Sequence, residues 1–172
     1  PLCKNFPECG GCQLMHLSYE KQLEYKTRKV HDLLHKFASI DIDVLPTIGL
    51  ENPTRFRNKV QKPVRRDSKN PNRIVCGFYK KGTHDLVPIK DCIIETELSN
   101  KISNVLIKLI IKYDYRPYDE DRQTGSIRHL LIKTSGENKA LVTLVSVTKK
   151  LPNIEEFSKE LVTICPEVVG VV

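Results

Sequence analysis

The spacing of apolar residues along the chain predicts helices that alternate with groups of strands. Apolar side chains recur every three or four residues, as on one face of a helix, in segments 17–37, 96–113 and 152–162. They alternate with polar side chains, as in half-buried strands, in segments 57–66, 73–81, 86–89, 127–134, 140–147 and 167–172. This order of elements predicts an α+β fold, with a mostly antiparallel β-sheet and two or three flanking helices.

Turn-forming residues indicate how the strands pair. Segment 135–138, which reads Ser-Gly-Glu-Asn, joins two of the strands as a tight hairpin. The polar segment 67–72 joins the first two strands in the same way. Pro63 lies inside the first strand, and because proline cannot donate a ladder hydrogen bond, it predicts an edge position or a bulge there.

The charge of the chain narrows the class of partner. Its 172 residues suffice for one domain with a hydrophobic core, and the formal net charge of +7 favours a polyanion, most commonly nucleic acid. An acidic membrane surface is disfavoured because no basic amphipathic face carries bulky aromatic residues. No apolar run approaches the ~20 residues of a membrane span. We therefore expect a cytoplasmic monomer without a membrane partner.

Cationic residues crowd the first strand and form a candidate nucleic-acid surface. Alternate residues of a strand share a face, so Arg57, Lys59 and Gln61 form a row. Its spacing of about 6–7 Å is close to the phosphate repeat of an extended single strand. The alternative interpretation is a solvated sheet face without a partner. The candidate RNA-binding residues are Arg55, Arg57, Lys59, Gln61, Lys62, Arg65, Lys80, Arg128 and His129.

Three of the six cysteines cluster at the start of the chain. Cys3, Cys9 and Cys12 have the spacing C-x5-C-x2-C, and a C-x2-C turn lets two thiolates converge on one metal. Gly10 and Gly11 lie inside that turn, where the lack of a Cβ lets the backbone approach the sulfurs. Three ligands require a fourth, which the chain must supply from elsewhere.

Cys92 is the natural fourth ligand, because it lies at a boundary between a predicted strand and a predicted helix. In a cytoplasmic protein such clustering favours metal binding over disulfides. Four thiolates suit an iron–sulfur cluster and a zinc ion equally well, so the residues alone leave the metal open. We expect Cys76 and Cys165 to be small buried apolar residues.

Several stretches, in the correct order, resemble the bacterial RNA (uracil-5-)-methyltransferases. The similarity begins with Cys3-x5-Cys9-Gly10-Gly11-Cys12-Gln13-Leu14-x-His16 and continues with Tyr19-Glu20-x-Gln22-Leu23-x-Tyr25-Lys26. Later stretches are Phe56-Arg57-Asn58-Lys59-Val60-Gln61, Gly77-Phe78-Tyr79 with His84 and Asp91-Cys92, and Arg128-His129-Leu130 with Gly136-Glu137. One departure is Met15, where family members usually carry glutamine, but this is not a ligand position.

The resemblance implies a [4Fe-4S] cluster held by Cys3, Cys9, Cys12 and Cys92, and it favours iron–sulfur over zinc. It also implies ribosomal or transfer RNA as the partner and S-adenosylmethionine as the cofactor of the full-length protein. The chain would bind and position RNA whose target uridine is flipped into a methyltransferase pocket.

The resemblance also implies that the chain is the central part of a longer protein. It contains neither the Gly-rich turn of a donor pocket nor a catalytic Cys loop, and it stops inside the apolar segment 168–172. We expect residues 1–16 with 38–172 to form the iron–sulfur and RNA-binding domain, and helix 17–37 to pack toward the absent methyltransferase domain. Two alternatives stay open: a zinc-stapled RNA- or ribosome-binding module, and an electron-transfer iron–sulfur protein.

Overall fold

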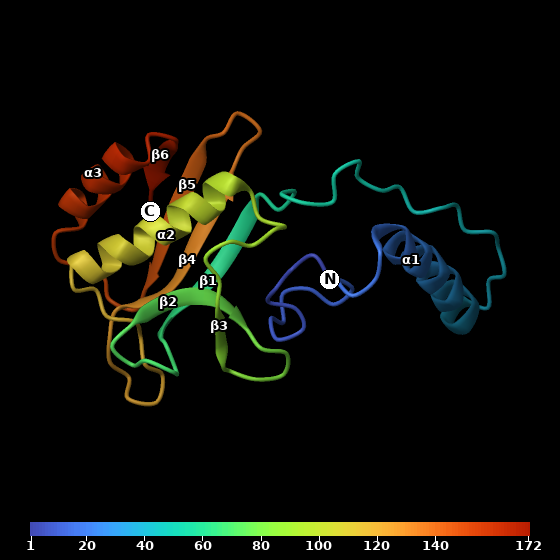
Figure 1. Cartoon of the computed structure of the whole chain (residues 1–172), viewed down its shortest axis with the longest axis horizontal. Coiled ribbons are helices and arrows are strands. Elements are labelled where there is room, and N and C mark those ends of the chain that lie inside the picture. Colours follow the sequence, from blue (N-terminus) through green and yellow to red (C-terminus); the bar gives the residue numbers. More distant parts are fainter.

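Six strands form one sheet that is built mainly from antiparallel neighbours. The structure is a computed structural model that describes residues 1–172, and its strand order is β3-β2-β1-β4-β5-β6 (Figure 1). Only the last pair, β5 with β6, is parallel. The strands are β1 (Lys59–Arg66), β2 (Ile74–Tyr79), β3 (Leu86–Pro88), β4 (Ile127–Thr134), β5 (Ala140–Ser146) and β6 (Val168–Val171).

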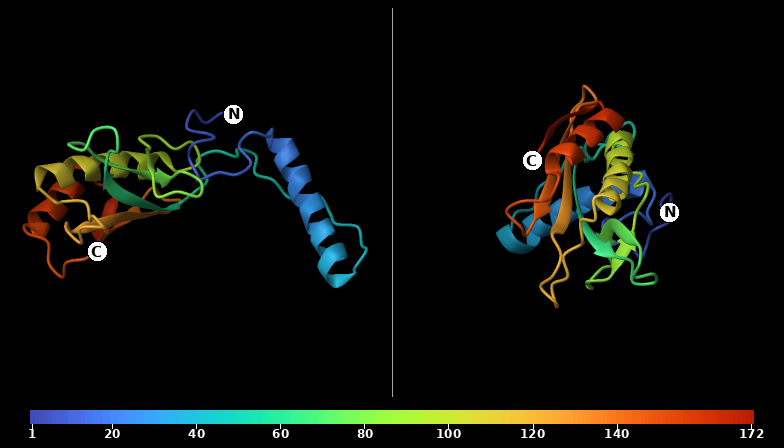
Figure 2. Two further views of the ribbon diagram at one scale, coloured as in Figure 1. Left: turned by 90° about the horizontal axis from the view of Figure 1, so that it is seen from below. Right: turned by 90° about the vertical axis from the view of Figure 1, so that its left-hand side faces the viewer.

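Two of the three helices cover one face of this sheet. The helices are α1 (Tyr19–Leu33), α2 (Glu97–Lys112) and α3 (Ile154–Ile164), and a π-helical turn, Leu34–Ala38, continues α1. α2 and α3 lie side by side on the sheet (Figures 1 and 2). Thr96 caps α2 by accepting a hydrogen bond from the Ser99 N–H at 3.2 Å, which satisfies one free donor of its first turn.

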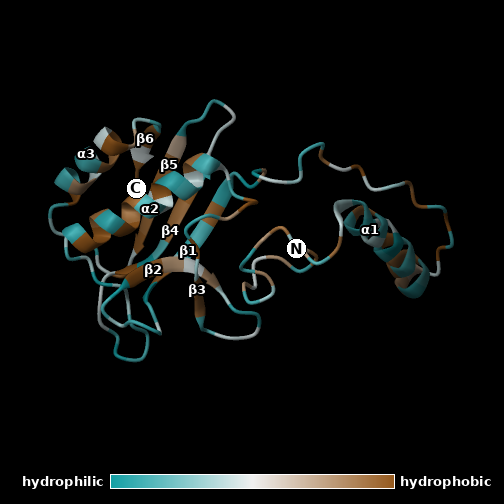
Figure 3. Cartoon of the chain, viewed as in Figure 1, coloured by the Kyte–Doolittle hydropathy of each residue, from teal (hydrophilic) through white to brown (hydrophobic).

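The hydrophobic core lies between these two helices and the sheet. The apolar colour of Figure 3 concentrates on the facing sides of α2 and the strands. Burial of these side chains is the main force that holds the domain together. The fully buried members include Ile102, Leu106 and Ile110 of α2, Phe157 and Leu161 of α3, and Val64, Leu130, Ile132 and Val142 of the sheet.

The opposite face of the sheet has no helix on it (Figure 2). It mixes polar and apolar residues, because Gln61 lies opposite Leu131 and Lys133 lies opposite Leu141. Lys59 of β1 lies opposite Lys133 of β4, and both side chains are exposed. Gln61 is exposed two residues further along β1. We call this surface, defined by Lys59, Gln61, Lys133 and the half-buried His129, the open face.

Of the two positions expected for Pro63, an edge strand or a bulge, the structure excludes the edge strand. β1 is central: residues 59–63 pair with β4, while residues 64–66 pair with β2. Pro63 therefore lies where β1 changes partner, between two short ladders. A proline is tolerated there because neither ladder runs unbroken along the whole strand.

The first part of the chain has no core of its own. No residue before Val60 is buried, and α1 stands away from the sheet (Figures 1 and 2). The connector that follows α1 runs back alongside it and is held by polar contacts: the Thr47 N–H donates to Thr27 Oγ1 at 2.9 Å, and the Leu50 N–H donates to the Tyr19 hydroxyl at 2.7 Å.

The secondary structure confirms the elements expected from the sequence. Each predicted helix and strand is present, and its ends move by no more than two residues when the π-helical turn Leu34–Ala38 is counted with α1. The α+β class with a mostly antiparallel sheet is confirmed. None of the helices is long and apolar enough to cross a membrane.

Candidate functional site

The cysteines expected to bind metal line one cavity beside β2. Cys3, Cys9 and Cys12 come from the N-terminal loop, and Cys92 comes from the segment between β3 and α2. None of them forms a disulfide. Residues some 80 positions apart in sequence are thereby brought together. The rest of the wall is largely apolar, with Phe6, Met15, Phe78, Ile89, Ile93 and Ile94.

The two glycines of the cysteine loop allow close approaches on both of its sides. The Gly10 N–H donates to the Tyr79 carbonyl at 2.9 Å, and a Cβ on Gly10 would lie 2.7 Å from that oxygen. The Gly11 N–H points at Cys9 Sγ, 3.5 Å away. Any larger residue at position 10 would push the loop away from β2, so Gly10 fixes where the loop docks.

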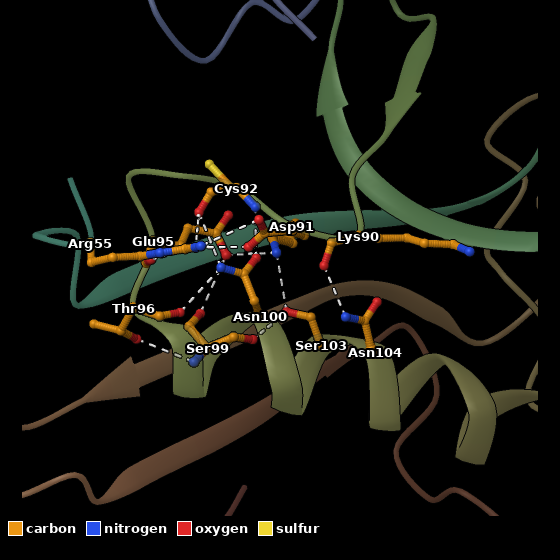
Figure 4. Close-up of polar contacts among 11 residues, drawn as sticks. Arg55, Lys90, Asp91, Cys92, Glu95, Thr96, Ser99, Asn100, Ser103 and Asn104 are labelled. Atoms are coloured by element: carbon orange, nitrogen blue, oxygen red, sulfur yellow. Dashed lines mark hydrogen bonds and ion pairs between the residues drawn. The ribbon is translucent and has the colours of Figure 1, made fainter. Parts of the chain in front are cut away.

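Cys92 is held by side chains that bind its backbone rather than its sulfur (Figure 4). Asn100, in the first turns of α2, accepts from the Cys92 N–H at 2.9 Å and donates to the Cys92 carbonyl at 3.1 Å. Arg55 donates to the same carbonyl at 2.8 Å and to the Asp91 carboxylate at 2.7 Å. These contacts fix the position of Cys92 before any ligand binds, which is how outer residues orient a metal ligand.

Burial keeps three of these thiols protonated at neutral pH in the absence of a cation. It raises the pKa of Cys9, Cys12 and Cys92 above the ordinary thiol value. Neighbouring groups oppose this shift at each thiol: the Gly11 N–H lowers the pKa of Cys9, the Arg57 guanidinium lowers that of Cys12, and the Ile94 N–H lowers that of Cys92. A bound metal would supply the positive charge that the thiolates lack.

The donor set fits a thiolate-bound metal group, but the thiols do not converge on one point. No three His, Cys, Asp or Glu side chains lie close enough together to hold a single ion. The space between the four cysteines is about 20 Å³, which is room for about one water molecule. A larger group would therefore require the N-terminal loop to move outward, which is possible for a segment without buried residues.

Next to the Cys92 segment lies a buried ion pair that no sequence pattern predicts. Lys62 Nζ is 2.7 Å from Glu95 Oε2, and both side chains are fully buried. Ser103 accepts a further hydrogen bond from Lys62 Nζ at 3.2 Å, whereas Glu95 Oε1 has no partner. The expectation that Lys62 binds RNA is wrong for this structure, because its ammonium group faces the core and not the solvent.

The other candidate RNA-binding residues are distributed over five separate places. Lys59 and Gln61 lie on the open face, with His129 on the neighbouring strand. Burial lowers the pKa of His129, and the guanidinium groups of Arg65 and Arg128 lower it further, so the imidazole is neutral at pH 7.

Arg65 and Arg128 lie together at the far end of β1 and β4, where both donate to Glu120 Oε1, at 3.1 and 2.9 Å. Lys80 is exposed just after β2, Arg57 borders the cysteine cavity, and Arg55 belongs to the Cys92 network. The predicted set therefore does not form one continuous patch.

Sequence reasoning missed the residues that support the site. Asn100, Glu95 and Glu120 were not singled out, because their roles depend on contacts with residues 8 to 55 positions away. The signal that could have identified Asn100 is its place just after the cap of a helix that directly follows Cys92. An asparagine there can reach back to the preceding backbone.

The chain is similar to curated bacterial proteins named as uncharacterised RNA methyltransferases. The match to the protein from Clostridium tetani is 37% identical and covers 100% of this chain and 37% of that protein. The match to the protein from Bacillus cereus is 34% identical, over 99% of this chain and 37% of the relative. The match to the protein from Streptococcus pneumoniae is 36% identical and covers 99% of this chain and 38% of the relative.

A solved structure shares the fold. It is the tRNA (uracil-54, C5)-methyltransferase of Pyrococcus abyssi in complex with S-adenosyl-L-homocysteine. Its TM-score is 0.66 and its sequence identity 22%, and the match covers 87% of this chain and 34% of that one. No model of a known protein family matches the chain. The chain is thus related over its whole length to RNA methyltransferases, and it spans little more than a third of the length of the curated relatives it matches.

Proposed function

We propose that the chain is the iron–sulfur and RNA-binding part of an S-adenosylmethionine-dependent RNA (uracil-5-)-methyltransferase. The observation that carries the proposal is the meeting of four cysteines around one cavity, in a chain that is related over its whole length to RNA methyltransferases. The shared fold with an S-adenosyl-L-homocysteine complex of a uracil-C5 enzyme supports the finer assignment of the reaction.

The cluster would be held by Cys3, Cys9, Cys12 and Cys92. In a four-iron cluster each thiolate binds a different iron, so the sulfurs stand farther apart than four ligands of one zinc ion. The four cysteines line one cavity that is smaller than such a cluster, so the N-terminal loop would move outward to admit it. The bound group would act as a cross-link from residue 3 to residue 92. Such a cross-link lowers the entropy of the unfolded chain and thereby stabilises the fold by about 4 kcal/mol.

RNA would contact the exposed cationic residues of the chain, namely the open face, Lys80 and the region around Arg65 and Arg128. The uridine would react in a pocket that lies outside these 172 residues, on a methyltransferase domain toward which α1 packs. The chain alone would then bind RNA and transfer no methyl group. Methyl transfer to RNA by the pure 172-residue chain would contradict the assignment of catalysis to a separate domain.

Anaerobic purification followed by metal and sulfide analysis tests the cluster. We expect about four iron and four sulfide per chain, with a brown absorbance that Cys92→Ser abolishes. Cys76→Ala, which removes a cysteine from the core and not from the cavity, is the control and should keep the colour. Colourless protein with one zinc per chain would overturn the iron–sulfur assignment and favour a zinc-stapled RNA-binding module.

A further inference from the structure

A polar pocket lies at the far end of β1 and β2 and has no role in the cysteine site. Its volume is about 800 Å³, and only two of its thirteen lining residues are hydrophobic. The residues that matter here are Arg66, Arg116, Arg122, His84, Tyr118 and Glu120, and we call this site the arginine pocket. A pocket of this size with so polar a lining suits a charged, hydrophilic ligand.

The wall of the pocket is a rigid loop. The Asp119 N–H donates to the Thr124 carbonyl at 2.7 Å, and the Tyr118 N–H donates to the Ile127 carbonyl at 2.8 Å. Gly125 has a φ of +100°, and a Cβ there would lie 2.2 Å from the Pro117 carbonyl oxygen. Only glycine permits this turn, so the loop is shaped in advance of ligand binding.

Two of the three acidic residues that line the pocket accept hydrogen bonds from neighbouring donors, whereas the third, Asp121, is exposed and has no such donor. Glu120 is shared by Arg65 and Arg128, whose guanidinium groups lower its pKa. Asp119 Oδ1 accepts from two backbone N–H groups of its own loop, at 3.1 and 3.0 Å. Arg65 is therefore occupied in building the wall of the pocket, because its guanidinium also donates to the Tyr118 carbonyl at 3.1 Å and to the Tyr79 hydroxyl at 3.2 Å.

Three other guanidinium groups keep free donors. Arg66 donates to the Pro71 carbonyl at 2.9 Å through one nitrogen only. Arg116 and Arg122 reach carboxylates only at 3.8 and 3.9 Å, which is too long for a strong hydrogen bond. All three are exposed, and a guanidinium binds phosphate oxygens in a forked geometry.

Aromatic rings stand beside these donors. His84 is exposed, makes no hydrogen bond and packs against the edge of Tyr79, with ring centroids 6.1 Å apart. Tyr118 is half-buried and carries the Arg128 guanidinium 5.0 Å from its ring centroid. Guanidinium groups next to exposed rings form the combination that binds a nucleotide, through its phosphate and through the face of its base.

A second groove continues from the arginine pocket toward the cysteine loop. It shares Tyr79 and His84 with the pocket, carries Lys80 and Lys81, and reaches Gly10 and Gly11. A single nucleotide would fill only the pocket, whereas a polymer would follow both. We propose that the arginine pocket binds an unpaired nucleotide of single-stranded RNA, whose strand continues past His84 along this groove. This inference rests on the proposed RNA-binding function.

Binding of a labelled single-stranded oligoribonucleotide to the 172-residue chain tests the inference by fluorescence anisotropy. The triple variant Arg66→Gln, Arg116→Gln, Arg122→Gln should weaken binding about tenfold or more, and it should reduce the salt slope by up to about 2. The control is Arg28→Gln, Lys29→Gln, Lys36→Gln, which removes the same charge from exposed positions on and beside α1. It should change the affinity less than twofold.

The outcomes separate the two proposals. If the chain binds RNA and the pocket variant binds as well as its control does, the arginine pocket is not the site, while the proposed function stands. If the wild-type chain does not bind RNA, the proposed function fails, and the inference fails with it.

A second variant tests the proposed contact between His84 and an RNA base. His84→Ala should weaken RNA binding about fivefold, because a stacked base contributes through the ring. The same variant should leave the affinity for inorganic polyphosphate, measured by its competition with the labelled RNA, unchanged. Equal loss for RNA and polyphosphate, or no loss for RNA, would overturn the base contact and leave a plain anion site.

Discussion

The two parts of the chain, residues 1–58 and residues 59–172, are held in place by different forces. Every buried residue lies in the second part, where β1–β6, α2 and α3 enclose one core. In the first part, α1 and the cysteine loop are fixed by polar contacts with neighbouring loops and with β2. The comparison teaches that hydrophobic burial specifies the second part, whereas polar contacts and close backbone approaches position the first part.

The first part also exposes apolar side chains that a monomeric protein normally covers. The exposed fraction is 97% for Ile48, 84% for Leu45 and 74% for Phe37. In Figure 3 the apolar colour appears along the connector beside α1, away from the core. Several large apolar side chains exposed within one short stretch of chain favour an interface there.

The largest expected effect distinguishes the two parts by their contribution to stability. Phe157→Ala empties a fully buried position between α3 and the sheet, and we expect a loss of about 3–5 kcal/mol in the free energy of unfolding. Phe37→Ala makes the same chemical change at a ring that is 74% exposed, and we expect less than about 0.5 kcal/mol. Urea denaturation of both variants measures the difference, and similar losses would contradict the comparison.

A smaller effect is expected at the buried ion pair of the second part. Lys62→Met leaves Glu95 without its partner, and we expect a loss of about 3 kcal/mol, because an uncompensated buried carboxylate is costly. The double variant Lys62→Met, Glu95→Leu removes both charges and should recover most of that loss. Chemical denaturation of the single and double variants gives the coupling energy. A double variant as unstable as the single one would show that the pair itself stabilises the fold.

Most of the fold could be predicted because its signals are local. The spacing of residues such as Leu106 and Ile110 in α2, or the turn before Ala140, depends only on neighbours in sequence. Pro63 predicts an edge position or a bulge because the rule for proline in strands considers a single ladder. The change of partner along β1 is a property of the whole sheet, which no local pattern contains.

The candidate site was predictable only in part, for the same reason. Cysteine spacing indicated three ligands, and Cys92 was inferred from its place before a helix. By contrast, strand periodicity could not show that Lys62 faces inward, because a lysine normally marks the solvent side. Its partner Glu95 is 33 residues away in sequence, and the two charges become compatible with the core only as a pair.

The smallest effect on this chain is expected on α1, and it sharpens the comparison most. Val30→Ser together with Leu33→Ser should change the stability of the 172-residue chain by less than about 0.5 kcal/mol, because both side chains are nearly half exposed. If α1 packs on a methyltransferase domain, the same pair of changes in a longer protein that contains this domain should cost about 2 kcal/mol or more, since two apolar side chains lose their burial. Thermal or urea denaturation of both lengths measures the two values, with Lys29→Ser as a polar control on the same helix. A large loss already in the short chain would mean that α1 belongs to the core of residues 59–172, and equal small losses in both lengths would mean that the exposed stripe of α1 is not an interface.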